Sequence, residues 1–248
     1  MPHNYFSFQG QVMLADNAAA NSDPRLLGNV ATLELSLNAE TIDHYESQTG
    51  RRSLDLQMVK TLSAEISLTL EEWTPDNLAF ALWGSRADVT AGSVSGETVG
   101  GASPSTGVPY QLDNMNVSNV VLTDSAGTPA TLAEGTHYTL DARFGRITFL
   151  DLAGLTTPIQ AAYSYAGRID VALFTQPMKE YRLLFHGVDT LQGDRPVRVE
   201  LYRTSFNPIQ GLPLINEEIG QMEMSGALLA DLSRPSTDAL GQYGVIQW

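Results

Sequence analysis

Alternation of apolar and polar residues at every second position is the feature that most constrains this chain. The stretch GNVATLELSL, residues 28–37, sets Leu33, Leu35 and Leu37 on one side of an extended chain and Glu34 and Ser36 on the other. This pattern is typical of a strand with one dry face and one wet face. We therefore expect the leucines to pack into a core and the polar side chains to face water or a wet interior.

The same alternation recurs along most of the sequence. It is clearest in KTLSAEISLTLEEW, residues 60–73, where Leu62, Ala64, Ile66, Leu68 and Leu70 alternate with serine, threonine and glutamate. Shorter strand-like segments follow around residues 146–150, 159–165, 181–187 and 197–203. Strands at this density predict a mainly all-β fold, either a β-sandwich or a barrel.

One short helix is predicted in TPDNLAFALWG, residues 74–84. Thr74 is suited to cap the helix, Pro75 occupies a first position where its missing N–H costs nothing, and Asp76 complements the helix dipole. Gly84 is placed to end it. We expect this helix to flank an end or edge of a sheet.

A change of composition after the helix predicts the domain organisation. Residues 87–110 are dense in glycine, serine and threonine, which favours a loop or an arm reaching an adjacent copy. Residues 111–167 then predict a small inserted β module. The remaining chain, residues 1–86 and 168–248, is expected to form one core in two parts.

Composition and charge exclude several classes of protein. With 43% hydrophobic residues the chain can form a real core, and with no cysteine it has no disulfide or thiolate metal site. The opening MPHNYFSFQGQV does not resemble a signal peptide, and no apolar run approaches the roughly 20 residues of a membrane helix, so we expect no membrane contact.

Acidic residues number 28 against 14 basic ones, giving a net charge of −14, and Lys60 and Lys179 are the two lysines. This balance keeps a protein soluble, and it disfavours specific binding of duplex DNA, which needs clustered Lys or Arg.

Searching for catalytic chemistry gives little. The four histidines, His3, His44, His137 and His186, are dispersed along the chain, and adjacent carboxylates such as Glu71 and Glu72 point to opposite faces of a strand. We therefore predict no catalytic residues, no metal and no cofactor. An enzyme with dispersed carboxylates stays open as an alternative, because distant acids can meet in the fold.

A resemblance to a known family emerges from the order of several segments. These segments are FSFQGQVMLA from Phe6, the GNV turn and strand already quoted, the acidic segment with Glu40, His44, Glu46 and Ser47, the loop TGRRSLD at 49–55, the LWG end of the helix, EGTHYTLDARFGRITFL from Glu134, and GQMEMSGALLAD at 220–231. Arranged in this way, the chain resembles the major tail tube proteins of long-tailed, non-contractile bacteriophages.

That resemblance implies a β-sandwich or barrel tail-tube fold, with copies forming hexameric rings that stack into the tube of a virion tail, assembled in the bacterial host cytoplasm. Its partners would be other copies, a tape measure protein inside, terminator and distal tail proteins at the ends, and double-stranded DNA passing without specific binding. The polar face would then line the lumen, and loops would join the subunits. The candidate lumen residues are Glu34, Ser36, Glu65, Ser67 and Thr69, and the candidate inter-subunit residues are Arg51, Arg52, Ser93 and Ser95.

A second function belongs to another class. Aromatic residues crowd the predicted module and would suit the platform of a monomeric glycan-binding or adhesin domain. These residues are Tyr138, Phe144, Phe149, Tyr163 and Tyr165. They are equally the natural core of so small a unit, which is the interpretation we favour.

Overall fold

The computed structural model describes residues 5–17, 22–48, 50–237 and 239–248, and these form two compact units. Unit 1 comprises residues 1–86 and 171–248, and unit 2 comprises residues 87–170. A two-stranded ribbon, β5 (Ser85–Val89) with β12 (Arg168–Ala172), contains both points where the chain passes between the units. No helix within the described ranges is long and apolar enough to span a membrane.

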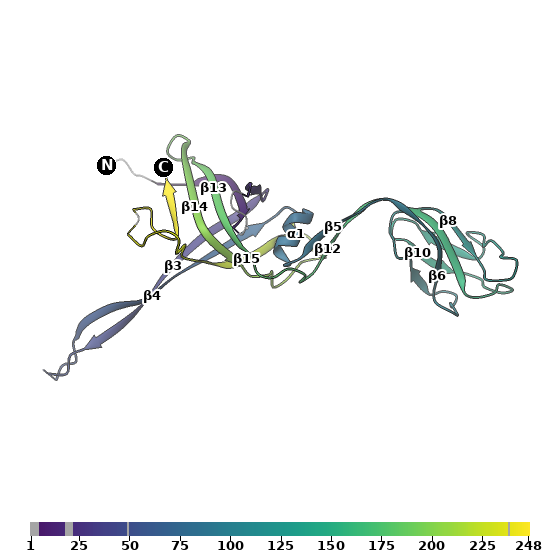
Figure 1. The fold of residues 1–248 in the computed structure, drawn as a ribbon, viewed down its shortest axis with the longest axis horizontal. Coiled ribbons are helices and arrows are strands. Elements are labelled where there is room, and N and C mark those ends of the chain that lie inside the picture. The colour runs from purple at the N-terminus through teal and green to yellow at the C-terminus, as the bar shows by residue number, and fades with distance from the viewer. Residues whose placement is uncertain (1–4, 18–21, 49, 238) are drawn as a thin grey trace. The chain divides into compact units, whose positions relative to one another are not determined.

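Unit 1 is built on one eight-stranded sheet with the order β2-β1-β13-β14-β15-β4-β3, in which β16 pairs with β14 (Figure 1). Its strands are β1 (Phe8–Asp16), β2 (Arg25–Leu26), β3 (Val30–Tyr45), β4 (Leu54–Leu70), β13 (Glu180–Asp189), β14 (Arg195–Phe206), β15 (Met222–Leu228) and β16 (Gly244–Gln247). The pairings within this sheet are antiparallel. The predicted mainly β fold is confirmed.

The sheet divides at β14, because two strands share its second edge. β16 pairs with Arg198–Leu201, and β15 pairs with Thr204–Phe206. On its other side β15 pairs with β4, and β4 pairs with β3. The chain therefore has two sets of strands that can pack against each other, and buried residues of β1, β4, β13, β14 and β15 form one hydrophobic core.

Helix α1 (Pro75–Ala81) completes that core, and its predicted start is confirmed. The Thr74 hydroxyl accepts a hydrogen bond from the Asn77 N–H at 3.2 Å. Phe80 packs edge-on against Phe206, with the ring centroids 5.3 Å apart. Gly84 takes part in ending the helix as predicted, because its N–H donates to the Ala79 carbonyl at 2.7 Å, but Trp83 and not Gly84 takes the left-handed conformation. Gly84 also lies so close to the Ala172 carbonyl that a Cβ there would clash.

Unit 2 consists of two three-stranded sheets around a second core. One sheet has the order β7-β10-β9, and the other has the order β6-β11-β8. The strands are β6 (Gly92–Val99), β7 (Pro109–Gln111), β8 (Val117–Thr123), β9 (Tyr138–Asp141), β10 (Arg146–Phe149) and β11 (Ile159–Tyr165). Burial raises the pKa of Tyr163 to about 12, and its hydroxyl donates a hydrogen bond to Glu97.

The prediction of a loop over residues 87–110 is wrong, because the structure places part of β5, β6 and β7 there. Val94 and Val99 alternate with serine and threonine along β6 and pack on the core of unit 2, while Ser93 and Ser95 are exposed. A strand with few large side chains needs only this one apolar face to hold it. The high content of small polar residues was therefore a property of an edge strand, not of an arm.

The prediction that Leu33, Leu35 and Leu37 all pack into a core is also wrong for most of β3. Leu33 packs against the core, but Leu35 is exposed and 76% of the Leu37 surface is accessible. The reason is that the core ends: β15 pairs with β4 only over Ala64–Leu70, and no second layer of the described residues covers the strands beyond.

A bidentate ion pair holds β13 to β14. Arg203 donates from Nε and Nη2 to the Glu180 carboxylate at 2.9 and 2.7 Å, and from Nη1 to the Ala230 carbonyl at 2.7 Å. The hydrogen bonds from Arg203 lower the pKa of Glu180 below its usual value of 4.5. A carboxylate with a lowered folded-state pKa stabilises the fold above its unfolded pKa, and that contribution is lost as the pH falls through the folded pKa.

Glu180→Gln should therefore lower the stability of the protein at neutral pH and have progressively less effect below about pH 4.5. Urea unfolding at a series of pH values measures this. Glu218→Gln is the matched control, because Glu218 is exposed. A deficit of Glu180→Gln that persists unchanged into acid would contradict the assigned role.

The end of the core on β4 can be located with two substitutions on the same strand. Ile66 is 1% exposed and Leu62 is 60% exposed. Ile66→Ala should destabilise the monomer by about 2 to 5 kcal/mol, because it leaves a cavity, whereas Leu62→Ala should change stability by no more than about 0.5 kcal/mol. Equal losses in denaturant unfolding would show that the strand is covered along its whole length.

Candidate self-assembly surface

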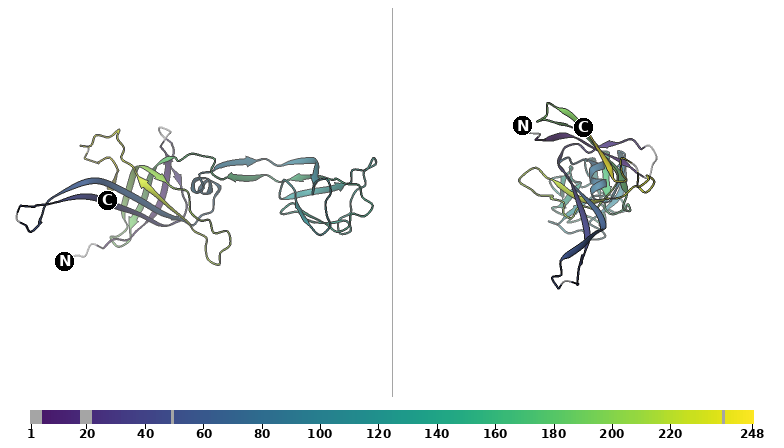
Figure 2. Two further views of the ribbon diagram at one scale, coloured as in Figure 1. Left: turned by 90° about the horizontal axis from the view of Figure 1, so that it is seen from below. Right: turned by 90° about the vertical axis from the view of Figure 1, so that its left-hand side faces the viewer.

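The outer parts of β3 and β4 form an arm that has no other strand beside it. We define the arm as residues 38–62. Figures 1 and 2 show it leaving the body of unit 1 as a two-stranded ribbon. Its register is antiparallel, from Asn38 opposite Ser63 to Tyr45 opposite Leu54. β3 lies at the end of the sheet order, so its outer edge has no partner strand among the described residues.

Two register shifts interrupt the pairing of β3 with β4, and the exposed apolar side chains lie on opposite faces before and after the first shift. The register shifts between Glu40 and Thr41 and again between His44 and Tyr45. Nearer the body, one face carries an apolar group that we call the proximal strip, consisting of Leu35, Leu37 and Leu62. Beyond the first shift, the opposite face carries an apolar group that we call the distal strip, consisting of Ile42, Leu56 and Met58. Both assignments follow from the alternation of side chains along β3 and from its partners on β4.

All six side chains of the two strips are exposed in the single chain. An isolated two-stranded ribbon is only marginally stable in water. Contiguous exposed apolar side chains mark sites of protein contact. The arm is therefore built to be covered by something else.

Polar pairs hold the two strands of the arm in register. His44 Nδ1 lies 2.5 Å from Asp55, Lys60 donates to Glu40 at 2.7 Å, and Gln57 donates to Asp43 at 2.9 Å. All of these groups are exposed, so each pair contributes little to stability. Their role is to define the shape of the arm.

The five candidate lumen residues lie together on the face of the sheet opposite the core. The paired rows Glu34–Ser67 and Ser36–Glu65 are exposed, and Thr69 is half-buried, accepting a hydrogen bond from Thr32 at 2.8 Å. β15 extends these rows with Glu223 opposite Thr69 and Ser225 opposite Ser67.

The sequence analysis did not include Glu223 and Ser225 among the lumen candidates, although polar and apolar residues alternate in MEMSG, residues 222–226, as they do in the neighbouring strands. Glu34, Glu65 and Glu223 thus place three carboxylates on one polar face across three strands, with no cation in the rows described. This face is acidic and has the same sign of charge as nucleic acid.

The four candidate inter-subunit residues do not form one group. Arg51 and Arg52 are exposed in the turn at the end of the arm, which puts them in a position to meet another molecule. Ser93 and Ser95 lie on β6 in unit 2, where β6 pairs with β11. The arginines therefore belong to the arm, and the serines do not.

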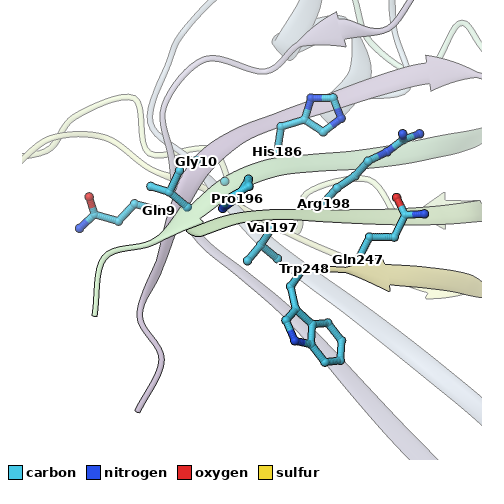
Figure 3. Close-up of a pocket in the computed structure, with 10 residues that line it drawn as sticks. Gln9, Gly10, His186, Pro196, Val197, Arg198, Gln247 and Trp248 are labelled. Atoms are coloured by element: carbon cyan, nitrogen blue, oxygen red, sulfur yellow. The ribbon is translucent and has the colours of Figure 1, made fainter. Parts of the chain in front are cut away.

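A second exposed apolar surface of unit 1 lies where residues 5–8 and 246–248 meet β13 and β14. A hollow of about 430 Å³ is lined by Tyr5, Phe6, Phe8, Asp189, Gln192, Arg195, Val197, Ile246 and Trp248. Another of about 670 Å³ adjoins it at Val197 and Trp248. Figure 3 shows Val197 and Trp248 on one side of the sheet and His186, Arg198 and Gln247 on the other. We call the first hollow the terminal groove.

Hydrogen bonds fix the wall of the terminal groove. The Asp189 carboxylate accepts from the Ser7 and Leu191 N–H groups at 3.1 Å each, and the Thr190 N–H donates to the Ser7 carbonyl at 3.0 Å. Phe6 and Phe8 stack with centroids 5.2 Å apart. Phe6 and Trp248 are 72% and 71% exposed, so these rings are uncovered in the single chain.

The described residues show no group of three or more histidines, cysteines, aspartates or glutamates placed to hold a metal ion. His3 lies outside the described residues, and His186 is exposed on β13. Glu71 and Glu72 serve the structure, because Glu71 accepts from the Asn29 side chain and Glu72 accepts from the Asn29 N–H at 3.0 Å.

Burial removes most of the proposed aromatic platform. Tyr138, Phe149 and Tyr163 are buried in the core of unit 2, Tyr165 is half-buried, and Phe144 is exposed. The preferred interpretation of these residues as a core is confirmed for the first three. They are not available to stack on a sugar.

The model of a family described as "Protein of unknown function UCP028589" matches residues 5–247. No curated protein shows significant similarity to the chain.

Shortening the arm should separate folding from assembly. Replacing residues 40–61 with Asn-Gly keeps Ala39 opposite Leu62 and supplies a two-residue hairpin turn. The shortened chain should unfold at nearly the same denaturant concentration as the native chain, because the arm lies outside the core, and it should stay monomeric in sedimentation velocity. Assemblies identical to those of the native chain would show that the arm is not an assembly element.

Proposed function

The chain belongs to this family of proteins of unknown function, and we propose that it is a structural subunit that polymerises into a tube, of the kind formed by the major tail tube proteins of long-tailed, non-contractile bacteriophages. Copies form hexameric rings, the rings stack, and the acidic face lines a lumen through which duplex DNA passes. The proposal concerns a virion protein without catalytic activity.

The observation that carries the proposal is an open sheet with one acidic face and an uncovered arm. β3 and β2 end the sheet order, so at both ends of the same sheet each copy offers a strand edge that no other described strand pairs with. Edges of this kind are removed when neighbouring copies close a barrel. The proximal strip continues the core face of β3 beyond the body, so a neighbour placed there would extend the core.

The sign of the charge fits a conduit. Duplex DNA carries one negative charge per about 1.7 Å of its axis, and proteins bind it by neutralising phosphates with Lys or Arg. The face with Glu34, Glu65 and Glu223 has no such group in its rows, so it repels the phosphates. A lumen of this kind lets DNA slide.

Electron microscopy of the purified chain tests assembly directly. Rings or hollow tubes are expected, and these should dissociate when the arm is shortened. A chain that stays monomeric at high concentration would contradict the proposal. Binding to a glycan array by such a monomer would favour the alternative of an adhesin domain, for which the structure offers Phe144 as an exposed aromatic residue of unit 2.

Reversing the charge of the lumen face should make tubes retain DNA. Glu34→Lys with Glu65→Lys should leave tubes intact, since both side chains are exposed, and should bind short duplexes at low salt. DNA held inside should resist nuclease. Glu217→Lys with Glu218→Lys, which lie in an exposed loop, provides the matched control and should bind DNA that nuclease still digests. Digestion of both populations at the same rate would place Glu34 and Glu65 outside a lumen.

A further inference from the structure

We infer that unit 2 is a display module: unit 1 alone builds the wall of the tube, and unit 2 lies on the outer side, in contact with solvent and with molecules outside the tube. This inference rests on the proposed function and deepens it by assigning different tasks to the two units. All residues of unit 2, 87–170, lie within the described part of the chain, so its surface can be judged as a whole.

Unit 2 buries its apolar side chains within itself. Leu122, Ile147, Phe149 and Ile159 are fully buried in its core. The side chains of this core, together with those packed around it, all come from residues 94–165. A module with a complete core of its own needs no neighbouring molecule to fold.

Polar groups of unit 2 near the ribbon are likewise paired within the unit. The buried Tyr163 hydroxyl donates to Glu97 and accepts from the Asn114 amide at 3.0 Å. The Arg168 guanidinium donates to the side-chain carbonyl of Asn114, and the Asp113 N–H donates to Glu97 at 2.9 Å. Because these residues all belong to unit 2, the polar cluster needs no group from unit 1 or from another copy.

The strand edges of unit 2 are poorly suited to pairing with another molecule. β7 and β9, the edges of one sheet, are three and four residues long. β6 and β8, the edges of the other sheet, are each interrupted by a bulge opposite β11, and the bulges contain Gly96 and Asn119 with positive φ. Short edge strands and bulges are the means by which proteins prevent sheets of different molecules from joining.

The apolar side chains of unit 2 are less exposed than those of unit 1. Six large apolar side chains of unit 2 are exposed, and none of them by more than 54%. They lie on different strands and turns of the unit: Val108, Met115, Val121, Phe144, Leu150 and Ile169. In unit 1, by contrast, Leu37 of the proximal strip is 76% exposed and Ile215 is 98% exposed. Because dispersed and partly covered apolar side chains are ordinary on a soluble surface, the surfaces that need another copy lie in unit 1.

The size of unit 2 excludes it from the lumen. A compact module of its length has a radius of gyration of about 12 Å. Six such modules in each ring would obstruct the passage of duplex DNA that the proposed function requires. A module that is neither in the wall nor in the lumen lies on the outer side of the tube.

Labelling with a bulky reagent tests this position, and the chain has no cysteine of its own. Ser93→Cys lies on β6 of unit 2, and the matched control Ser36→Cys lies on the lumen face; both serines are exposed in the single chain. A maleimide coupled to streptavidin should react with both variants as monomers. After tube assembly, Ser93→Cys should react at nearly the monomer rate, whereas the reaction of Ser36→Cys should slow by at least about tenfold, because the reagent is too large to enter the lumen.

Removing unit 2 gives an independent readout. Replacing residues 87–170 with Asn-Gly joins Arg86 to Val171 through a two-residue turn. The shortened chain should form tubes at nearly the same protein concentration as the native chain, because the contacts between copies lie in unit 1. The matched control is the chain that lacks residues 40–61 of the arm, which should not assemble.

The possible outcomes distinguish the inference from the proposed function. Reaction of Ser93→Cys in tubes, together with tubes from the chain without unit 2, supports the inference. Tubes in which Ser93→Cys no longer reacts, or a folded chain without unit 2 that does not assemble, overturn the inference and leave the proposed function standing. A native chain that forms no rings or tubes overturns both.

Discussion

The structure of unit 1 depends on where strand β4 has neighbours. Over Ala64–Leu70 it lies between β15 and β3, and its apolar side chains enter a closed core. From Ser63 outward it keeps only β3, and no second layer of the described residues covers either face. The division of unit 1 into a body and an arm follows from this single loss of a neighbour. A sheet that continued to be paired on both sides would have no surface that needs another molecule.

The same strands carry two different surfaces because strand alternation keeps the faces separate. One face of β3, β4 and β15 packs the core, and the other presents Glu34, Glu65 and Glu223. A register shift at Glu40 and Thr41 then exchanges the polar and apolar faces along the arm. An extra residue in β4 is thus enough to place Met58 and Leu56 beside Ile42 on the face that is polar nearer the body, without any change in the type of secondary structure.

Much of the fold could be predicted from the sequence where a pattern of a few neighbouring residues determines the local structure. The cap at Thr74, the strand through Ile66 and the aromatic core around Phe149 each depend on patterns within a few residues. Local rules failed where a distant partner decides. Alternation in β3 is the same at Leu33 and Leu37, but only the first lies where the core continues. The strand β6 was missed because its partner β11 lies some sixty residues further on.

The candidate surfaces also differ in how far local sequence patterns could predict them. Glu34, Ser36, Glu65 and Ser67 could be placed on one face from parity alone, and the structure puts them there. The arm itself was assigned to the wrong segment, because its signal is the absence of a third strand rather than any feature of its own residues. The terminal groove could not be found from sequence, since Phe6 and Trp248 stand at opposite ends of the chain and meet only through β13, β14 and β16.

Under the proposed function, the β3 edge of one copy meets the β2 edge of the next, and these two edges are unlike. Such a heterologous contact always leaves one free edge of each kind at the ends of an assembly, so copies continue to add unless rotation closes a ring. The register shifts and the net charge of −14 work against indiscriminate pairing of the open β3 edge. Under our proposal, the register shifts and the charge therefore restrict which edges pair, and this permits ordered extension of a tube by a chain whose open edge would otherwise promote aggregation.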